Sequence, residues 1–171
     1  MYTSAGQVSV VVPYEVAGNA STNVQLQYLG TRSNVLSFLV TDSAPGIFTL
    51  DMSGQGAILN QDFSINSAQN GAVPGSIVSI YATGEGQTDP GGLDGIITGS
   101  LLRKPRLNVS VQIGGQDADV LYAGAAPGQL AGLLQVNARV PLGVARGVAV
   151  PVSIAIGSAS SQAGVTVAIK P

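Results

Sequence analysis

Neither cysteine nor histidine occurs in this chain of 171 residues. Without cysteine there are no disulfides and no thiol chemistry, and without histidine the commonest acid–base group and metal ligand is missing. A serine nucleophile needs a base, and the only lysines that could serve are Lys104 and Lys170. We therefore expect a protein that is not an enzyme and that needs no cofactor.

Charge is also scarce, because only 9% of the residues are charged and the net charge is −2. Nucleic-acid binding requires a basic stripe, whereas the only basic cluster is Arg103, Lys104 and Arg106. No apolar run reaches the roughly 18 residues of a membrane span. The first residues, MYTSAGQ, have neither the basic nor the apolar region of a signal peptide. We expect a mature or excised segment that neither binds nucleic acid nor inserts into a membrane.

Short aliphatic stretches make up most of the chain, separated by the turn-forming residues Gly, Pro, Asn, Asp and Ser. The stretches are rich in β-branched side chains, and no window carries a capped helical stripe. This pattern predicts an all-β protein built as an antiparallel β-sandwich. The expected strands are Val8–Val12, Val24–Leu29, Val35–Val40, Gly46–Leu50, Ala57–Leu59, Ser76–Ala82, Leu107–Ile113, Ala118–Tyr122, Leu133–Val140, Val148–Ile156 and Gly164–Ile169.

One sequence element occurs twice. QVSVVVPYEVA begins at Gln7 and QVNARVPLGVA begins at Gln135, so the two copies lie 128 positions apart. The match extends to further segments on both sides, and each copy consists of three consecutive predicted strands. The matched segments are Met1-Tyr2 with Leu121-Tyr122, Val24–Gly30 with Val150–Gly157, and Val35–Val40 with Gly164–Ile169.

The two copies differ in what precedes them, because only the second follows further predicted strands, from Phe48 to Asp119. A three-stranded layer with one apolar face needs another layer to cover that face. We therefore expect residues 1–44 to be the C-terminal half of one immunoglobulin-like sandwich and residues 45–171 to be a complete one of seven or eight strands. The missing strands would come from upstream in a parent protein or from another copy of this chain.

The incomplete half is predicted to expose an apolar assembly face. Strand addition from a neighbouring copy would cover it and give a dimer or a head-to-tail fibre. The residues expected on this face are Val8, Val10, Val12, Leu26, Tyr28, Phe38 and Val40.

Four stretches carry a resemblance to a known family: APGIFTL (44–50), GAILNQDFSIN (56–66), VPGSIVSIYATGEGQTDP (73–90) and VLYAGAAPGQLAGLLQVNARVP (120–141). Together they resemble the uncharacterised C-terminal domain of large secreted proteins from Solibacter and related Acidobacteria. VPYEVAG (12–18) resembles the segment that usually precedes that domain. The resemblance implies an exported multi-domain protein, with this domain behind immunoglobulin-like, propeller or cadherin-like repeats, and it implies no activity. Family members usually have further strands before the position of Met1.

The most site-like stretch is ATGEGQTDPGGLDG (82–95). Glu85, Asp89 and Asp94 on this glycine-rich loop could bind Ca²⁺, which takes oxygen ligands from flexible loops. Their spacing does not match the EF-hand loop. We favour the alternative, a long turn whose carboxylates are solvated.

Two further sets of residues have a chemical and a structural interpretation. Asp117 and Asp119 share one face of an extended segment, as paired carboxylates of glycosidases can, but the preceding glycines predict that they decorate a hairpin. The aromatic residues could stack on a sugar, yet they are spread along the chain and include no Trp. We expect core positions for Phe38, Phe48, Phe63 and Tyr81.

The sequence thus favours a non-catalytic structural or adhesion module of an exported bacterial protein, outside the cell or at its surface. The partners expected are upstream domains or other copies of the chain. The alternative is an extracellular module whose loops at one end of the sandwich bind a glycan or Ca²⁺.

Overall fold

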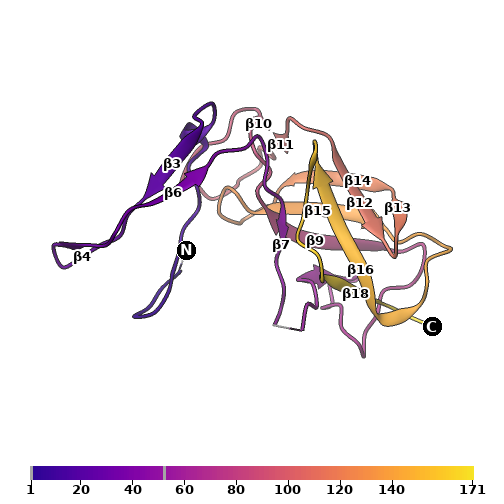
Figure 1. Ribbon diagram of the computed structural model, residues 1–171. Coiled ribbons are helices and arrows are strands. Elements are labelled where there is room, and N and C mark those ends of the chain that lie inside the picture. The colour runs from indigo at the N-terminus through magenta and orange to yellow at the C-terminus, as the bar shows by residue number, and fades with distance from the viewer. Residues whose placement is uncertain (1, 52) are drawn as a thin grey trace.

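The computed structural model describes residues 2–51 and 53–171, and they form an all-β protein. Within these residues the only helical element is a single 3-10 turn, η1, at Tyr14–Val16. The strands pair antiparallel throughout the named sheets. The chain divides visibly into a layered body, residues 45–171, and an arm, residues 2–40, that projects from it (Figure 1).

The first layer of the body is a five-stranded sheet with the order β14-β15-β9-β7, in which β8 also pairs with β9. Its strands are β7 (Gly46–Ile47), β8 (Ile58–Leu59), β9 (Ile77–Thr83), β14 (Val120–Ala125) and β15 (Leu134–Arg139). The central strand β9 therefore receives hydrogen bonds from β15 on one edge and from β7 and β8 on the other.

The second layer is a five-stranded sheet with the order β13-β12-β16-β17, in which β18 also pairs with β16. Its strands are β12 (Val109–Ile113), β13 (Gln116–Ala118), β16 (Gly147–Ile156), β17 (Ala159–Ser160) and β18 (Thr166–Ile169). The C-terminal half of the long strand β16 pairs with β12, and its N-terminal half pairs with β18.

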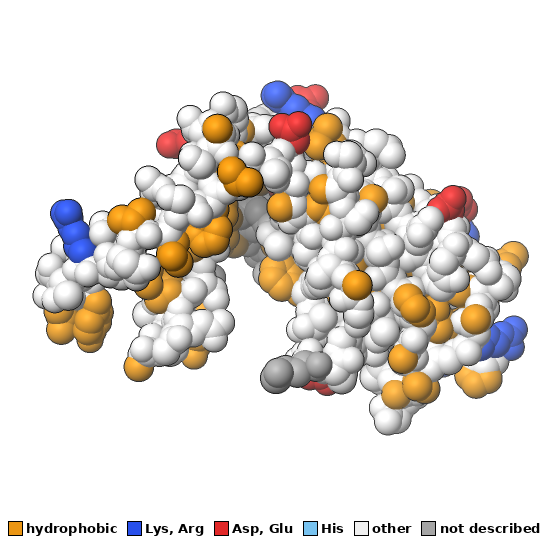
Figure 2. Space-filling view, viewed as in Figure 1, with side chains coloured by type: hydrophobic (Ala, Val, Ile, Leu, Met, Phe, Trp, Pro, Cys, Tyr) orange, Lys and Arg blue, Asp and Glu red, His pale blue; other side chains and the backbone are white. Residues whose placement is uncertain are grey.

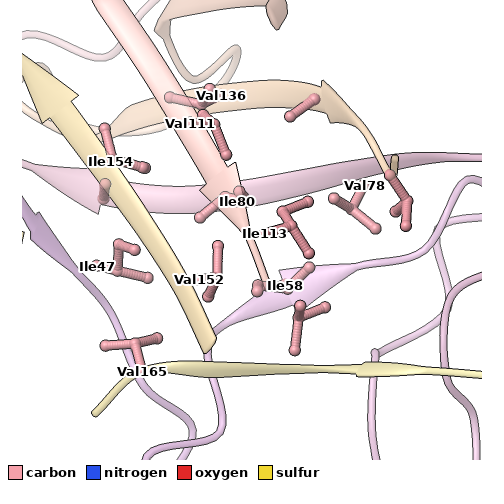
Figure 3. Packing of buried hydrophobic residues seen from close by; sticks show 14 of the residues in the cluster. Ile47, Ile58, Val78, Ile80, Val111, Ile113, Val136, Val152, Ile154 and Val165 are labelled. Atoms are coloured by element: carbon pink, nitrogen blue, oxygen red, sulfur yellow. The ribbon is translucent and has the colours of Figure 1, made fainter. Parts of the chain in front are cut away.

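The core lies between the two layers and is aliphatic. Alternate residues of each strand point into it: Val78 and Ile80 of β9 are fully buried, as are Ile154 and Ile156 of β16. Figure 3 shows Ile154 and Val111 from the second layer lying over the strand that carries Ile80. Period-two alternation of this kind is what burial of one sheet face requires.

A buried asparagine fixes the long connection between β8 and β9. The Asn66 side chain is fully buried and donates hydrogen bonds to Oδ1 of Asn60 and to the carbonyl of Ala168, each at 2.9 Å. Its own Oδ1 accepts from the Ala168 N–H at 2.8 Å and from Nε2 of Gln55 at 3.1 Å. Because its polar atoms are satisfied, this amide ties the connection to β18 without the penalty of an unpaired buried group.

The remaining strands form two-stranded ribbons. One of them, on the body, joins β10 (Thr88–Asp89) to β11 (Lys104–Pro105). The arm contains the ribbons β1-β2, β3-β6 and β4-β5. Their bounds are β1 Tyr2–Thr3, β2 Val8–Ser9, β3 Ser21–Val24, β4 Gln27–Tyr28, β5 Thr31–Arg32 and β6 Leu36–Leu39.

The body differs from the expectation in how its strands are divided. The predicted strand Ala118–Tyr122 is the boundary between β13 and β14, which pair in different sheets. The ribbon β10-β11 was not predicted, because Thr88–Asp89 and Lys104–Pro105 show no apolar alternation. With two five-stranded sheets, the body has more strands than the seven or eight expected.

The prediction that aromatic side chains fill the core is wrong. Phe38, Phe48 and Phe63 are 52%, 44% and 80% exposed, and Tyr81 is half-buried. Tyr81 lies on the outer face of β9, because its neighbours Ile80 and Ala82 take the inward positions. Aliphatic side chains occupy the space between the layers instead.

Candidate interaction surface

Each ribbon of the arm repeats a strand pairing of the body in the same register. At the 128-residue spacing of the repeat (129 for the last strand, 120 for the first), most paired residues of the arm fall on paired residues of the body. Ser21–Leu39 does not, because the register of the body shifts between Gly147 and Val150. The matched pairs are Tyr2–Ser9 with Tyr122–Asn137, Thr22–Phe38 with Val150–Val167, and Tyr28–Thr31 with Ile156–Ala159. Met1, which the sequence matched to Leu121, lies outside the described residues.

Even a turn hydrogen-bond pattern is shared. In the arm, the Ser33 N–H donates to the Leu26 carbonyl at 2.9 Å, and the Leu26 N–H donates to Oγ of Ser33 at 3.0 Å. In the body, Ser161 and Ile154 form the same two bonds at 2.8 and 3.1 Å. The arm and the strands β14 to β18 are therefore two copies of one local structure.

The two copies have opposite environments. Of the seven predicted face residues, six are between 42% and 78% exposed and Val40 is half-buried. Their counterparts in the body are at most 2% exposed. These counterparts, in the same order, are Val136, Ala138, Val140, Ile154, Ile156, Val167 and Ile169. Figure 2 shows hydrophobic side chains lying open along the arm.

The strands of the arm also have unpaired edges. Within the described residues β2 pairs only with β1, whereas its counterpart β15 pairs with both β14 and β9. Likewise β3 and β4 pair only with β6 and β5, whereas their counterpart β16 also pairs with β12. Among residues 2–51 and 53–171, therefore, no strand lies beside the arm at the two positions that β9 and β12 occupy in the body.

Tyr14 joins the arm to the body. Its hydroxyl donates to Oε1 of Glu85 at 2.8 Å, and its N–H donates to Oδ1 of Asp94 at 2.8 Å. Nε2 of Gln87 donates to the Tyr14 carbonyl at 2.9 Å. A Cβ placed on Gly92 would lie 2.4 Å from the Tyr14 ring, so only glycine lets the ring lie this close to the backbone.

Glu85 is 2% exposed, and within the described chain its Oε2 has no hydrogen-bond partner. Burial raises the pKa of Glu85, and the hydrogen bond from Tyr14 counteracts part of that rise. Burial, followed by the negative charge of Glu85, raises the pKa of the Tyr14 phenol, so the phenol stays protonated and donates. This pair is a part-buried hydrogen bond that links arm and body.

Two glycines bring the chain between arm and body against the loop that carries Glu85. The Ala44 N–H donates to the Gly84 carbonyl at 3.0 Å, and a Cβ on Gly84 would lie 1.8 Å from the Ala44 carbonyl oxygen. A Cβ on Gly86 would lie 2.0 Å from the Asp42 carbonyl oxygen. Both glycines have a positive φ. The spacing of GEG in the sequence thus serves close backbone contact at the junction.

The three acidic residues singled out as Ca²⁺ candidates have separate roles. Glu85 binds Tyr14, Asp94 caps the Tyr14 N–H, and Asp89 is an exposed residue of β10 that pairs with Lys104 of β11. Across residues 2–51 and 53–171, no three Asp, Glu, His or Cys side chains gather into a group that could hold a metal ion.

The other predicted candidates lie on the surface of the body. Asp117 is on the hairpin strand β13 and accepts from Nε2 of Gln112 at 2.9 Å. Asp119 lies 4.0 Å from Nε of Arg139, and both side chains are exposed. These contacts agree with the expectation that the two carboxylates decorate a hairpin.

The basic cluster supports the loop between β9 and β12. Nε of Arg103 donates to the Gly91 carbonyl at 2.8 Å, and Nε of Arg106 donates to the Thr88 carbonyl at 3.1 Å.

The link between Tyr14 and Glu85 was not predicted from the sequence. The two residues lie 71 positions apart, and the glycine-rich stretch around Glu85 predicted a solvated turn. One signal was present: the repeat places Tyr14 where the second copy has Leu142, a polar-tipped ring in place of an aliphatic residue. A tyrosine at that position can reach a buried acceptor, which leucine cannot.

Comparison with protein-family models, with curated proteins and with solved structures finds no match for this chain. In the described part of the chain, none of the elements is a helix with the length and apolarity needed to cross a bilayer.

Proposed function

We propose that this chain is a non-catalytic structural module of an exported bacterial protein, and that its arm docks on a second β layer. In this proposal the body is a complete sandwich of the immunoglobulin-like type and the arm is the C-terminal half of another. The resemblance to the C-terminal domain of secreted Acidobacteria proteins supports the same class of function. Such a module connects neighbouring domains, or assembles copies of the chain, by pairing their β layers.

The observation that carries the proposal is the contrast in burial at matched positions. Six side chains that are 42% to 78% exposed in the arm correspond to side chains at most 2% exposed in the body. Burying one side chain of this size stabilises a structure by about 1.5–3 kcal/mol. Large exposed apolar patches mark interaction sites, and Figure 2 shows apolar side chains exposed along the arm.

The charge of the arm agrees with a docking role. Among residues 1–44 only Glu15, Arg32 and Asp42 are charged, and none of them is among the seven face residues. Covering the face would therefore bury none of these charges. An unpaired buried charge strongly destabilises an interface.

Binding of a hydrophobic fluorescent dye, measured on protein diluted until its mass is that of one chain, tests the proposal. Replacing Leu26 by Ser should remove much of the dye binding, because Leu26 is 48% exposed on the arm face. The matched control is Leu121→Ser, at a leucine 51% exposed on the body, which should change dye binding little. Equal effects of the two variants would contradict the proposal. A melting temperature that rises several degrees with Ca²⁺ or a glycan would favour a binding module instead.

A further inference from the structure

We propose that the partner of the arm is the arm of a second copy, and that two arms form one shared sandwich about a twofold axis. This inference rests on the proposed function, since it names the layer on which the arm docks. The two open edges of the arm supply the geometry for it.

Strands that take the places of β9 and β12 beside the arm would run antiparallel to it. In the body, β15 pairs with β9 antiparallel, and β16 pairs with β12 antiparallel. An antiparallel pair can form between two copies of the same strand, because a twofold axis reverses the strand direction. Strand β2 can therefore pair with β2 of a second copy, and β3–β4 with β3–β4, in the places of β9 and β12.

The strands of the body at these places present aliphatic side chains to the core. The inward residues of β9 are Val78, Ile80 and Ala82, all fully buried at spacing two. The arm strand that would take this place presents aliphatic residues at the same spacing. These are Val8, Val10 and Val12.

The same holds in the other layer. Strand β12 directs Val111 and Ile113 into the core of the body. In the arm, Leu26 and Tyr28 are two residues apart and exposed on the corresponding strand. Each arm thus carries side chains of the kind that the other arm lacks.

Two paired arms would form a sandwich of the same type as the body. The body takes half of each sheet, β7 to β9 and β12 to β13, from residues before Val120, and the other half from β14 to β18. An arm repeats the second half only. Two arms provide two halves of each sheet. The pair therefore completes both sheets and covers the apolar face of each arm. A closed twofold pair, unlike a head-to-tail contact, does not grow into a fibre.

Light scattering during size-exclusion chromatography tests this with the full chain. We expect a particle with twice the 17.1 kDa mass of one chain. Val10→Glu should raise the dissociation constant at least about a hundredfold, because the twofold axis buries two unpaired carboxylates. The control is Val148→Glu, since Val10 and Val148 are both 62% exposed and Val148 belongs to the body; its mass should stay that of the pair. A thermal transition of the body like that of the unmodified chain shows that each variant is folded.

Spin labels test the symmetry of the pair. The chain has no cysteine, so Ser9→Cys on β2 gives one label for each copy. The inference predicts one short distance between the labels of the two copies. A pair in which the Ser9 labels are far apart overturns it.

The remaining outcomes separate this inference from the proposed function. A single-chain mass at all concentrations, with dye binding that Val10→Glu lowers and Val148→Glu does not, overturns the twofold pair and leaves the arm as a docking surface for another layer. A single-chain mass without that difference overturns both. A mass that grows without limit overturns the closed pair in favour of a head-to-tail chain.

Discussion

The arm and the C-terminal strands of the body share a sequence pattern, a strand register and a turn hydrogen-bond pattern, yet one copy is buried and the other is open. Leu26 is 48% exposed, and its counterpart Ile154 is fully buried. Both residues make the same two hydrogen bonds to a serine seven residues later. Turn geometry is therefore fixed by nearby residues, whereas burial depends on strands that lie far away in the sequence.

The junction shows how the open copy is held on the closed one. Tyr14, in the turn η1 of the arm, donates a hydrogen bond to the buried Glu85 of the body, and the Ala44 N–H donates to the Gly84 carbonyl. These contacts leave the apolar face of the arm free. They hold it in place without covering it, as a docking surface requires.

The largest expected difference between the two copies is the cost of removing a core side chain. Ile154→Ala should lower the free energy of unfolding of the body by about 3 kcal/mol, because it leaves a cavity between the sheets. Leu26→Ala should change the same quantity by less than about 0.5 kcal/mol, since the side chain is outside that core. Urea denaturation followed by circular dichroism measures both. Equal losses would mean that the arm is part of the core of the body.

A smaller effect is expected at the junction. Gly84→Ala should destabilise the protein by at least about 2 kcal/mol, because the new Cβ would meet the Ala44 carbonyl and the φ is positive. Gly128→Ala should cost only about 1 kcal/mol, because its φ is also positive but a Cβ there would have no described atom within 4 Å apart from its chain neighbours. Urea denaturation of both variants separates the close contact from the backbone strain. A Gly84 variant no worse than the Gly128 variant would contradict the observed approach.

The hydrogen bond from Tyr14 should contribute less again. Tyr14→Phe removes the one hydrogen bond that Glu85 receives and should cost about 1–2 kcal/mol. The control is Tyr28→Phe, whose hydroxyl belongs to a ring 78% exposed on the arm. Hydrogen exchange should quicken in residues 14–17 for the first variant and not for the second. Unchanged exchange in both would show that the link does not hold the arm.

The smallest effect expected is a pH dependence at Glu85. Its pKa is raised in the folded state above the ordinary 4.5, so the unfolded chain loses this proton first as the pH rises. The folded state is therefore favoured at low pH and loses stability as the pH rises from 4.5 through the raised pKa. The Glu85→Gln variant should not lose this stability as the pH rises.

The comparison with Glu85→Gln isolates one group. Hydrogen bonds from Ser53 and Ser64 lower the pKa values of Asp51 and Asp62, whose contributions fall as the pH falls, in both proteins alike. The difference between the two stability curves should thus widen toward higher pH. A constant difference would contradict a raised pKa at Glu85.

Local patterns in the sequence predicted much of this structure. The alternation in Val148–Ile156 predicted β16, and the repeated Val-Pro element predicted that the first copy has the strands of the second. The match of Val24 with Val150 was two residues out, because the observed pairings place Thr22 at the position of Val150. The exposed positions of Val10, Leu26 and Phe38 also followed from the expectation that the first copy is half of a sandwich.

What the sequence could not predict depends on contacts between distant residues. Phe63 has a left-handed backbone in an exposed turn, so the core position predicted from its apolar ring was wrong. The burial of Glu85 depends on Tyr14, which reaches it only because the arm returns to the β9–β10 loop. A carboxylate between two glycines looks like a solvated turn until that partner is known.

Hydrogen exchange of the backbone amides, measured on dilute and on concentrated protein, tests the central contrast most directly. We predict that β15 and β16 are protected at every concentration, and that β2 and β3–β4 become protected only where the mass shows assembly. If the arm strands are as protected as β15 and β16 in a single chain, the arm is complete by itself. If the arm strands stay unprotected in the assembled protein, the apolar face of the arm is not the interface.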